Sequence, residues 1–409
     1  MNKDSNVKKE YTMVACMLLL WGFIGLNRVG IAFLFPILVP LFHMSYFQAG
    51  LLISGTSVLW AVSSWVGGNM ADRLGRKKVL IPSMIFAGMM AALMGIAWNF
   101  TSMLTVRGLL GVGDGTGWSV GNSMVAEGSA PSRRGLNMGL YSGGYTLVGA
   151  GLGAIIITRL SASIGWRWVF PLVGAATVIV AIVIALVVKE KDRGDATRKA
   201  VPIWEVFKYR PMIYLIILNC LILTWLQVSI GFNPLFLTKV RHLSPVLAGS
   251  VLSGWGIAGF AGQMVLPAIS DVIGRKKIII VSALIASLIY WVYITSNISP
   301  ALLAVLISAS GFFGWGQLSL AMATVVSETV PERLHGTAIG VANFFGVIVG
   351  TTVMPAVGGW AAGVWGLSTP LIIAAAAMLL VAFIMIAVPE TAPRRGKFGG
   401  GGLRADLGD

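Results

Sequence analysis

The chain of 409 residues is 56% hydrophobic and only 11% charged, whereas soluble domains carry about 25% charged residues. The composition therefore excludes an ordinary water-soluble protein. Because each membrane crossing needs roughly 20 to 25 residues, it also leaves little chain for an enzymatic domain outside the lipid. The two cysteines, Cys16 and Cys220, both lie in apolar segments, which excludes a disulfide framework and a Cys-rich metal site.

In chain order, apolar segments bounded by charges or turn residues predict an all-α membrane protein with twelve transmembrane helices. The apolar segment after the charged N-terminus is too long for a cleavable signal, so it is taken as the first span. The predicted spans are residues 12–40, 46–71, 78–98, 101–126, 136–160, 167–188, 211–238, 244–270, 278–296, 299–327, 336–362 and 367–388.

Lysine and arginine are distributed unequally between the two sets of loops. With the N-terminus inside, 24 of the 30 basic residues fall in inner loops or tails and four in outer loops, while Arg28 and Arg107 fall inside spans. Because cytoplasmic loops carry an excess of basic residues, both termini are predicted to be cytoplasmic. The same distribution explains the net charge of +15 without a nucleic-acid partner. Short loops and tails favour a bacterial inner membrane.

The longest inner connection divides the spans six and six, and predicts two pseudo-symmetric bundles. It is charged and contains Pro202. The tail contains four consecutive glycines and is predicted to be disordered. The predicted parts are an N-terminal six-helix bundle (1–188), a cytoplasmic linker (189–210), a C-terminal six-helix bundle (211–392) and a cytoplasmic tail (393–409).

The loops after the second and eighth spans contain related motifs. The first reads GNMADRLGRKK from Gly68 to Lys78, and the second reads DVIGRKK from Asp271 to Lys277. Asp271 follows Asp72 by 199 residues. With this repeat and its six plus six spans, the chain resembles the major facilitator superfamily, whose hallmark is the G-x-x-x-D-R-x-G-R-K-K loop. The resemblance implies two six-helix halves related by an axis along the membrane normal.

The loops after the fourth and tenth spans form a second related pair, each running from a glutamate to an arginine and a glycine. Carboxylates at inner helix ends can face a neighbouring helix N-terminus or pair with arginines. We predict that such pairs hold the cytoplasmic side closed and break when it opens; the alternative is that the loops only set topology. The predicted gate residues are Asp72, Arg73, Arg76, Glu127, Arg133, Asp271, Arg275, Glu328 and Arg333.

Asp114 is the only acidic residue predicted near the middle of a span; the others, including Glu10, Glu205 and Glu390, are expected in loops, tails or inner helix ends. An ionisable group at that depth is costly and therefore a functional candidate. Arg107 lies seven residues earlier on the same helix face, about 10 Å away. Trp118 and Asn122 continue this face, which completes one polar stripe along the fourth span.

The first span adds Asn27 and Arg28 at a similar depth. Two arginines against one carboxylate leave an excess positive charge, and an arginine fork matches a carboxylate in a bidentate manner. We therefore predict an organic anion as substrate. Burial favours a protonated Asp114 while the arginines favour its charged form, so substrate arrival can change its proton occupancy. The alternative is a structural ion pair between Asp114 and either arginine.

These residues also carry a resemblance to the anion:cation symporters of the superfamily. Arg28 matches the arginine of that family's first span, although Asn27 stands where the family tends to have an acid. Arg107 and Asp114 match its fourth span, and Asn343 resembles an asparagine of its eleventh. The resemblance implies that Arg28 binds the substrate carboxylate, Asp114 carries the proton and Asn343 contacts substrate. The missing acid leaves one proton site and keeps electroneutral symport or exchange open.

Predicted spans of the second half contain no charge near mid-membrane. Gln227 is its additional predicted substrate contact, and Trp60 and Tyr145 are expected to face the cavity of the first half. Few hydroxyl-binding groups and many indoles favour a small or fairly apolar carboxylate over a polyhydroxylated one.

The favoured hypothesis is a secondary transporter, not an enzyme, that takes up a small organic anion with protons by alternating access. No cofactor or metal is expected, the proton is the expected coupling ion, and a monomer is expected in the lipid bilayer. The alternatives are an exporter or exchanger of amphiphiles, lipids or organic anions, resembling the spinster group, and a receptor or passive channel.

Overall fold

The computed structural model describes residues 3–188 and 202–392. The predicted tail and most of the predicted linker, 189–201, lie outside the described residues. Within them, every regular element is a helix, in agreement with the predicted all-α class.

The first half contains a long opening helix and several spans that are interrupted within their length. Its elements are α1 (Lys3–Leu41), α2 (Tyr46–Ser54), α3 (Ser57–Leu74), α4 (Arg76–Leu93), η1 (Met94–Ile96), α5 (Phe100–Gly128), α6 (Arg134–Gly144), η2 (Tyr145–Leu152), α7 (Gly153–Ile164) and α8 (Trp166–Val187).

The second half repeats this order after a short turn of helix. Its elements are η3 (Ile203–Lys208), α9 (Pro211–Lys239), α10 (Pro245–Ile273), α11 (Arg275–Thr295), α12 (Pro300–Ser319), η4 (Leu320–Thr324), α13 (Val325–Glu328), η5 (Glu332–Leu334), α14 (His335–Gly346), η6 (Val347–Val353), α15 (Met354–Trp365) and α16 (Ser368–Ala387).

Eleven helical segments in the described residues are long and apolar enough to cross a membrane. The remaining predicted span, 101–126, corresponds to α5, a helix of 29 residues. Its glycines, Arg107 and Asp114 lower its hydropathy, but it packs against α1, α3 and α4. A helix sheltered by other helices needs less apolar surface than one that faces lipid. The twelfth crossing stays a prediction.

Short sequence signals fix the starts of several helices. The Ser45 side chain accepts a hydrogen bond from the backbone N–H of Gln48, and the Gln48 side chain accepts one from Ser45, which forms a capping box. Ser244 and Ser299 cap α10 and α12, and each is followed by a proline, which is compatible with the first turn of a helix.

Two glycines turn the chain in the same way in the two halves. Gly75 joins α3 to α4 with φ 116° and ψ 137°, and Gly274 joins α10 to α11 with φ 117° and ψ 139°. Residues with a Cβ rarely adopt this positive φ. The glycine of each D-x-x-G motif is therefore required by the backbone, which explains the ordered spacing of the repeat.

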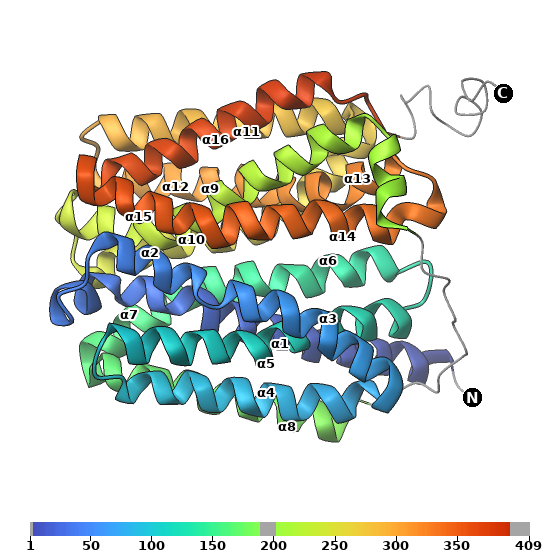
Figure 1. Cartoon of the computed structure of the whole chain (residues 1–409), viewed down its shortest axis with the longest axis horizontal. Helices are drawn as coiled ribbons and strands as arrows, with labels where there is room; N and C mark the ends of the chain where they lie inside the picture. Colours follow the sequence, from blue (N-terminus) through green and yellow to red (C-terminus); the bar gives the residue numbers. More distant parts are fainter. Residues whose placement is uncertain (1–2, 189–201, 393–409) are drawn as a thin grey trace.

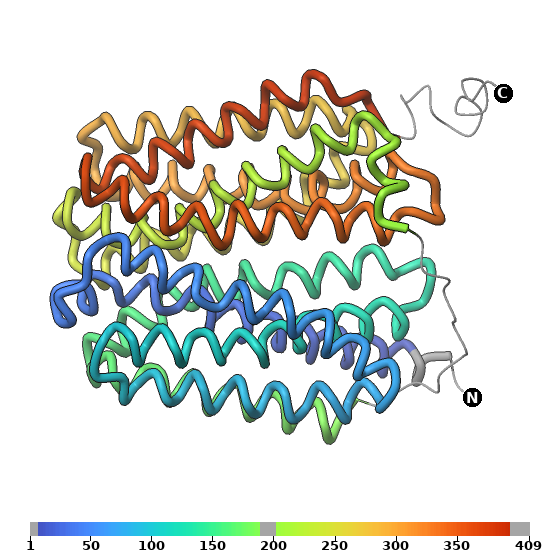
Figure 2. Tube along the Cα trace, in the orientation of Figure 1, coloured from blue at the N-terminus to red at the C-terminus, as the bar shows by residue number. Residues whose placement is uncertain are grey.

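The two halves lie in separate layers (Figure 1). Helices α1 to α8, drawn in blue to green, occupy one side, and α9 to α16 occupy the other (Figure 2). We call the end of the molecule that carries Arg73–Lys78, Arg133 and Arg275–Lys277 the basic end. The other end is called the opposite end.

Contacts between the halves are concentrated at the opposite end and in the middle. There α2 packs on α15, α7 on α10, and η2 on α10. Glycine makes the approach possible, since a Cβ at Gly50 would lie 2.1 Å from the Pro355 carbonyl oxygen. Toward the basic end, α14 packs mainly within its own half. The two halves are thus held together mostly away from the basic loops.

Candidate functional site

Arg28 occupies the centre of the predicted site without a polar protein partner in the described part of the chain. Its guanidinium carbon lies 5.0 Å from the ring centroid of Trp60, and the residue is half-buried. No hydrogen bond or ion pair engages its side chain among the described residues. A guanidinium that is stacked on indole keeps its N–H donors free for an anion.

Arg107 is held very differently, although it was predicted to bind the same substrate. Its side chain donates to three backbone carbonyls, at 2.6 Å to Leu52, 3.3 Å to Asn27 and 2.9 Å to Arg28. Leu52 lies in the last turn of α2, where helix carbonyls lack intrahelical partners and favour a cation. With 1% of its surface exposed, Arg107 ties α5 to α1 and α2.

Asp114 is fully buried, and both its carboxylate oxygens lack a hydrogen-bond partner among the described residues. It also has no ion pair there, so neither predicted structural pair is formed. The side chains of Asn27, Arg28 and Arg107 are its polar neighbours. Because an ionised carboxylate is costly to bury without partners, this arrangement suits a group that exchanges a proton.

Aromatic rings surround these charges and continue into the second half. Trp118 lies 5.0 Å from Trp60 and 6.5 Å from Trp21, measured between ring centroids. Trp21 lies 5.2 Å from Tyr145, which in turn lies 5.9 Å from Trp315 across the boundary between the halves. The rings therefore form a continuous series from the first-half charges to the second half.

The structure brings together most of the predicted first-half site, namely Asn27, Arg28, Trp60, Arg107, Asp114, Trp118 and Tyr145. Asn122 and Asn343 are half-buried and Gln227 is buried. In the described residues, no side-chain hydrogen bond or ring contact connects these last three with the cluster. Their predicted roles stay predictions.

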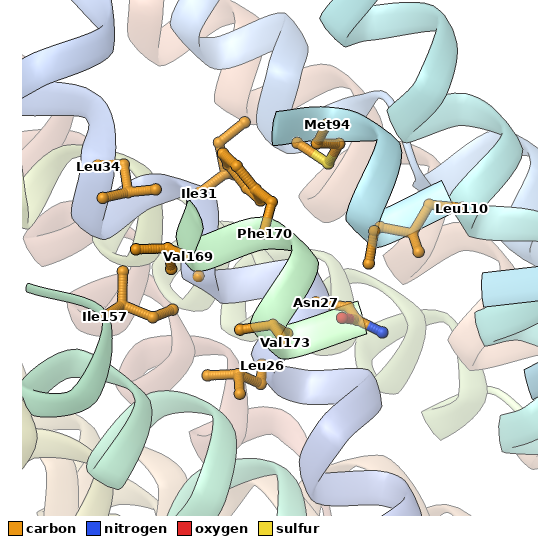
Figure 3. Close-up of a pocket in the computed structure, with 12 residues that line it drawn as sticks. Leu26, Asn27, Ile31, Leu34, Met94, Leu110, Ile157, Val169, Phe170 and Val173 are labelled. Carbon is orange, nitrogen blue, oxygen red and sulfur yellow. The ribbon is translucent and has the colours of Figure 1, made fainter. Parts of the chain in front are cut away.

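A small cavity lies beside this cluster, within the first half. Its volume is about 10 Å³, room for about one water. Figure 3 shows that its wall is apolar apart from Asn27, with Ile31, Leu110 and Phe170 among the lining side chains. It is too small for an organic substrate, so it is not the binding site.

The predicted gate pairs are present at the basic end. Arg76 lies 2.5 Å from a Glu127 oxygen, and Arg275 lies 2.9 Å from Glu328. Each arginine also pairs with the aspartate four residues before it, at 3.3 Å and 2.7 Å. Every one of these pairs joins elements of the same half, and their opening and closing stays a prediction.

The sequence analysis missed a second pair of ionic contacts at this end. Glu10, expected in a tail, lies in α1 and is 8% exposed. It binds Arg133 at 2.6 Å and Asn137 at 2.7 Å, and its hydrogen bond raises the pKa of Arg133. In the second half, Glu205 binds Arg333 at 2.6 Å. Glu10 and Glu205 each precede the first long apolar segment of their half. This shared position in the repeat could have been recognised in the sequence.

Two further side chains of the site were also missed. Trp21 connects Trp118, Tyr141 and Tyr145, but an aromatic residue in a span carries no distinctive signal. Thr146 donates to Gln263 at 2.7 Å across the boundary between the halves. Thr146 lies in η2, a π-helical segment, and such segments are frequent at functional sites.

The model of the Major Facilitator Superfamily matches residues 17–350. The chain belongs to this superfamily. It is therefore a transporter of a small molecule and a multi-pass membrane protein, not an enzyme.

Curated relatives of this chain are bacterial transporters. It is 25% identical over 349 residues to the "Probable 4-methylmuconolactone transporter" of Cupriavidus pinatubonensis, covering 83% of this chain and 81% of that protein. It is 23% identical to the D-galactonate transporter of Escherichia coli, covering 84% and 87%. It is 28% identical to the multidrug resistance protein MdtG of Escherichia coli, covering 70% and 71%.

Solved structures show the same fold. A bacterial homologue of the human lysosomal transporter Spinster, in an inward-facing and occupied conformation, matches with a TM-score of 0.74 and 18% identity over 92% of this chain and 95% of that one. The nucleoside transporter NupG matches with a TM-score of 0.77 and 13% identity over 94% and 99%.

Proposed function

We propose that the protein takes up a small organic monocarboxylate with a flat, largely apolar body, together with a proton. The proposal rests on the environment of Arg28, which lies in the interior of helix α1 and is half-buried. Its guanidinium stacks on Trp60 and has no polar protein partner in the described residues. A carboxylate completes such a site because it matches the guanidinium fork.

The surroundings of Arg28 favour one carboxylate over two. Arg107 is engaged by the carbonyls of Leu52, Asn27 and Arg28, so one free guanidinium is offered. The neighbouring Trp60 and Trp118 rings, 5.0 Å apart, suit a planar substrate body better than a chain of hydroxyl groups. The relatives named for 4-methylmuconolactone and D-galactonate support an organic acid in general.

Asp114 is the proposed proton carrier. An anion bound at Arg28 cancels the positive charge that favours an ionised Asp114, so the carboxylate takes up a proton as substrate binds. Release of the anion on the other side restores the field of Arg28 and expels the proton. With one such acid, symport of one proton and one monovalent anion is electroneutral.

Movement follows from the way the two halves touch. Contacts concentrate at the opposite end, where α2 meets α15 and α7 meets α10. Rocking of the halves about the middle opens that end and closes the basic end. Because the ion pairs of Arg76 and Arg275 join helices of one half, we propose that they stiffen each half during this motion, in place of the breaking that the sequence predicted. In the proposed arrangement, twelve spans form two six-helix bundles, the basic end is cytoplasmic, and the protein works as a monomer in a bacterial inner membrane.

A second candidate function is export of an amphiphile, which is supported by the similarity to MdtG. The same rings would then contact an apolar cargo, and Asp114 would drive exchange against protons. Flux in right-side-out and inverted vesicles separates the two functions, because uptake and export have opposite directions in the same proton gradient.

The test of the proposed function uses purified protein in proteoliposomes and 4-acetylbenzoate as the probe. Saturable uptake driven by an inward proton gradient is expected in the wild type, and its loss is expected in Arg28→Ala. Arg159→Ala is the matched control, since Arg159 is exposed. Equal uptake by Arg28→Ala and Arg159→Ala would contradict the proposal.

A further inference from the structure

Indoles in the second half, among them Trp255 and Trp315, have N–H donors that no group in the described residues accepts. Trp255 and Trp315 are 3% and 2% exposed, and their ring centroids lie 5.1 Å apart. The N–H group of each has no hydrogen-bond partner among the described residues. A buried tryptophan normally finds a partner for this group. Trp60 and Trp225 are further exceptions among the described residues, and unpaired donors of this kind indicate an acceptor that arrives from elsewhere.

The position of these rings connects them with the anion site. Trp315 lies 5.9 Å from Tyr145, and Tyr145 lies 5.2 Å from Trp21. Trp21 approaches Trp118, which touches Trp60 beneath Arg28. The two donors therefore stand at the other end of one series of rings that begins at the guanidinium.

Glycines lie against the Trp315 indole and against the backbone of Trp255. A Cβ at Gly259 would lie 2.5 Å from Cδ1 of Trp315, the carbon beside its N–H group. A Cβ at Gly311 would lie 2.1 Å from the Trp255 carbonyl oxygen. A larger residue at position 259 would therefore displace the Trp315 ring, and one at position 311 would push α12 away from the α10 backbone.

Charge decides which acceptor they can receive. The predicted spans of the second half contain no aspartate, glutamate, lysine or arginine between residues 211 and 238, 244 and 270, or 299 and 327. A second carboxylate would be buried there without a cation, which is costly. A neutral oxygen, such as a ketone, ester or lactone carbonyl, has a smaller free-energy cost of desolvation than a carboxylate. It can accept a hydrogen bond from an indole N–H.

We propose that the substrate carries a neutral hydrogen-bond acceptor at the end remote from its carboxylate, and that Trp255 and Trp315 donate to it. This rests on the proposed function, because the carboxylate is assigned to Arg28. In the structure the two N–H groups are buried and unpaired. In the proposal, closure of the two halves around the substrate brings its acceptor within hydrogen-bond distance of them. The second half thereby selects among acids that the first half binds alike.

The test compares two probes of the same shape, 4-acetylbenzoate and 4-isopropenylbenzoate, which differ in a C=O against a C=CH₂ group. Titration calorimetry on the full chain measures their dissociation constants in wild type, Trp255→Phe, Trp315→Phe and Trp360→Phe. Phenylalanine keeps an aromatic ring but removes the donor. Trp360 is the matched control because it is 53% exposed in the same half.

We expect the wild type and Trp360→Phe to bind 4-acetylbenzoate about tenfold more tightly than the isopropenyl probe. In Trp255→Phe or Trp315→Phe the preference falls to about twofold or less, with the isopropenyl probe bound as before. Equal affinity of the wild type for the two probes overturns the inference, and this result does not depend on whether the variants fold. A preference that survives in both variants overturns it too.

The design also separates this inference from the proposed function. Binding of both probes with equal affinity, abolished by Arg28→Ala, leaves the carboxylate site standing and removes only the donor pair. Failure of the wild type to bind either probe overturns the flat monocarboxylate itself, and the inference falls with it.

Discussion

The centres of the two halves differ far more than their ends. In the first half Arg28, Arg107 and Asp114 are gathered among aromatic rings. In the second, Trp225, Trp255 and Trp315 pack together at centroid distances of 5.1 to 6.5 Å. No acidic or basic residue of the described second half joins that indole cluster in a hydrogen bond or ion pair. In our proposals, the first half therefore binds the charge of the substrate and the second half binds its neutral polar end.

The basic ends of the halves, by contrast, repeat each other closely. Gly75 and Gly274 adopt the same positive φ, and Lys77 and Lys276 both donate to carbonyls at the end of the last long helix of their half. The repeat therefore preserves the parts that join and stiffen helices. Recognition diverged where the halves face each other, which is why the chemistry of the substrate is best sought in their differences.

The largest effect is expected from removing the charge in the first half. Arg28→Ala should lower the uptake efficiency, kcat/KM, for 4-acetylbenzoate by about 100-fold or more, because the carboxylate loses its charged donor. The thermal unfolding midpoint should change little, since the guanidinium makes no hydrogen bond or ion pair in the described residues and its ring contact is with Trp60. Uptake within threefold of the wild type would show that recognition does not reside in the first half.

Asp114→Asn should separate accumulation from binding. The variant should no longer concentrate 4-acetylbenzoate above the external level in a proton gradient, while exchange of internal for external probe continues within about fivefold of wild type. Glu332→Gln, in an exposed position, is the control. Accumulation of the probe by Asp114→Asn at the wild-type level would show that Asp114 does not carry the coupled proton.

Arg107→Met should act on stability rather than on charge recognition. The substitution leaves three carbonyl oxygens without the donors that now bind them, which is expected to cost about 2 to 4 kcal/mol. A thermal unfolding curve in detergent measures this loss. If the midpoint stays at the wild-type value while probe affinity collapses, Arg107 belongs with Arg28 in the anion site.

The smallest effects concern the repeated basic ends. Arg275 is 8% exposed and its partner Glu328 is 25% exposed, whereas Glu127, the partner of Arg76, is 57% exposed. Since exposed ion pairs contribute little and buried ones cost more when broken, Arg275→Ala should destabilise by about 2 kcal/mol and Arg76→Ala by about 1 kcal/mol or less. Thermal midpoints of the two variants compare them directly; a larger loss in Arg76→Ala would contradict this order.

Much of the fold follows from the sequence because apolar length and basic loops act over whole segments. The predicted spans match the helices closely, and the D-x-x-G repeat marks the turns at Gly75 and Gly274. The interruption between α2 and α3 near Gly55 and the π-helical segment η2 were not predicted. Both depend on contacts between helices, such as the donation from Arg107 to the Leu52 carbonyl, and these are invisible in one sequence.

The site was predicted in part for the same reason. An acid and two arginines inside spans are conspicuous, so the sequence predicts that Arg28, Arg107 and Asp114 gather, and their roles stay predictions. Their division of labour was not predicted, because the same residue type binds backbone carbonyls at Arg107 and an aromatic ring at Arg28. Trp21 and Glu10 went unnoticed because an indole in a span and an acid near a terminus are common, and only packing distinguishes them.

In the proposed function, binding of the anion at Arg28 is linked to binding of the proton at Asp114. Calorimetric titration of 4-acetylbenzoate in buffers of different ionisation enthalpy measures the protons exchanged on binding. We expect net proton uptake on anion binding in the wild type near neutral pH, and none in Asp114→Asn. Binding without proton uptake in the wild type, or with the same uptake in Asp114→Asn, would contradict this linkage.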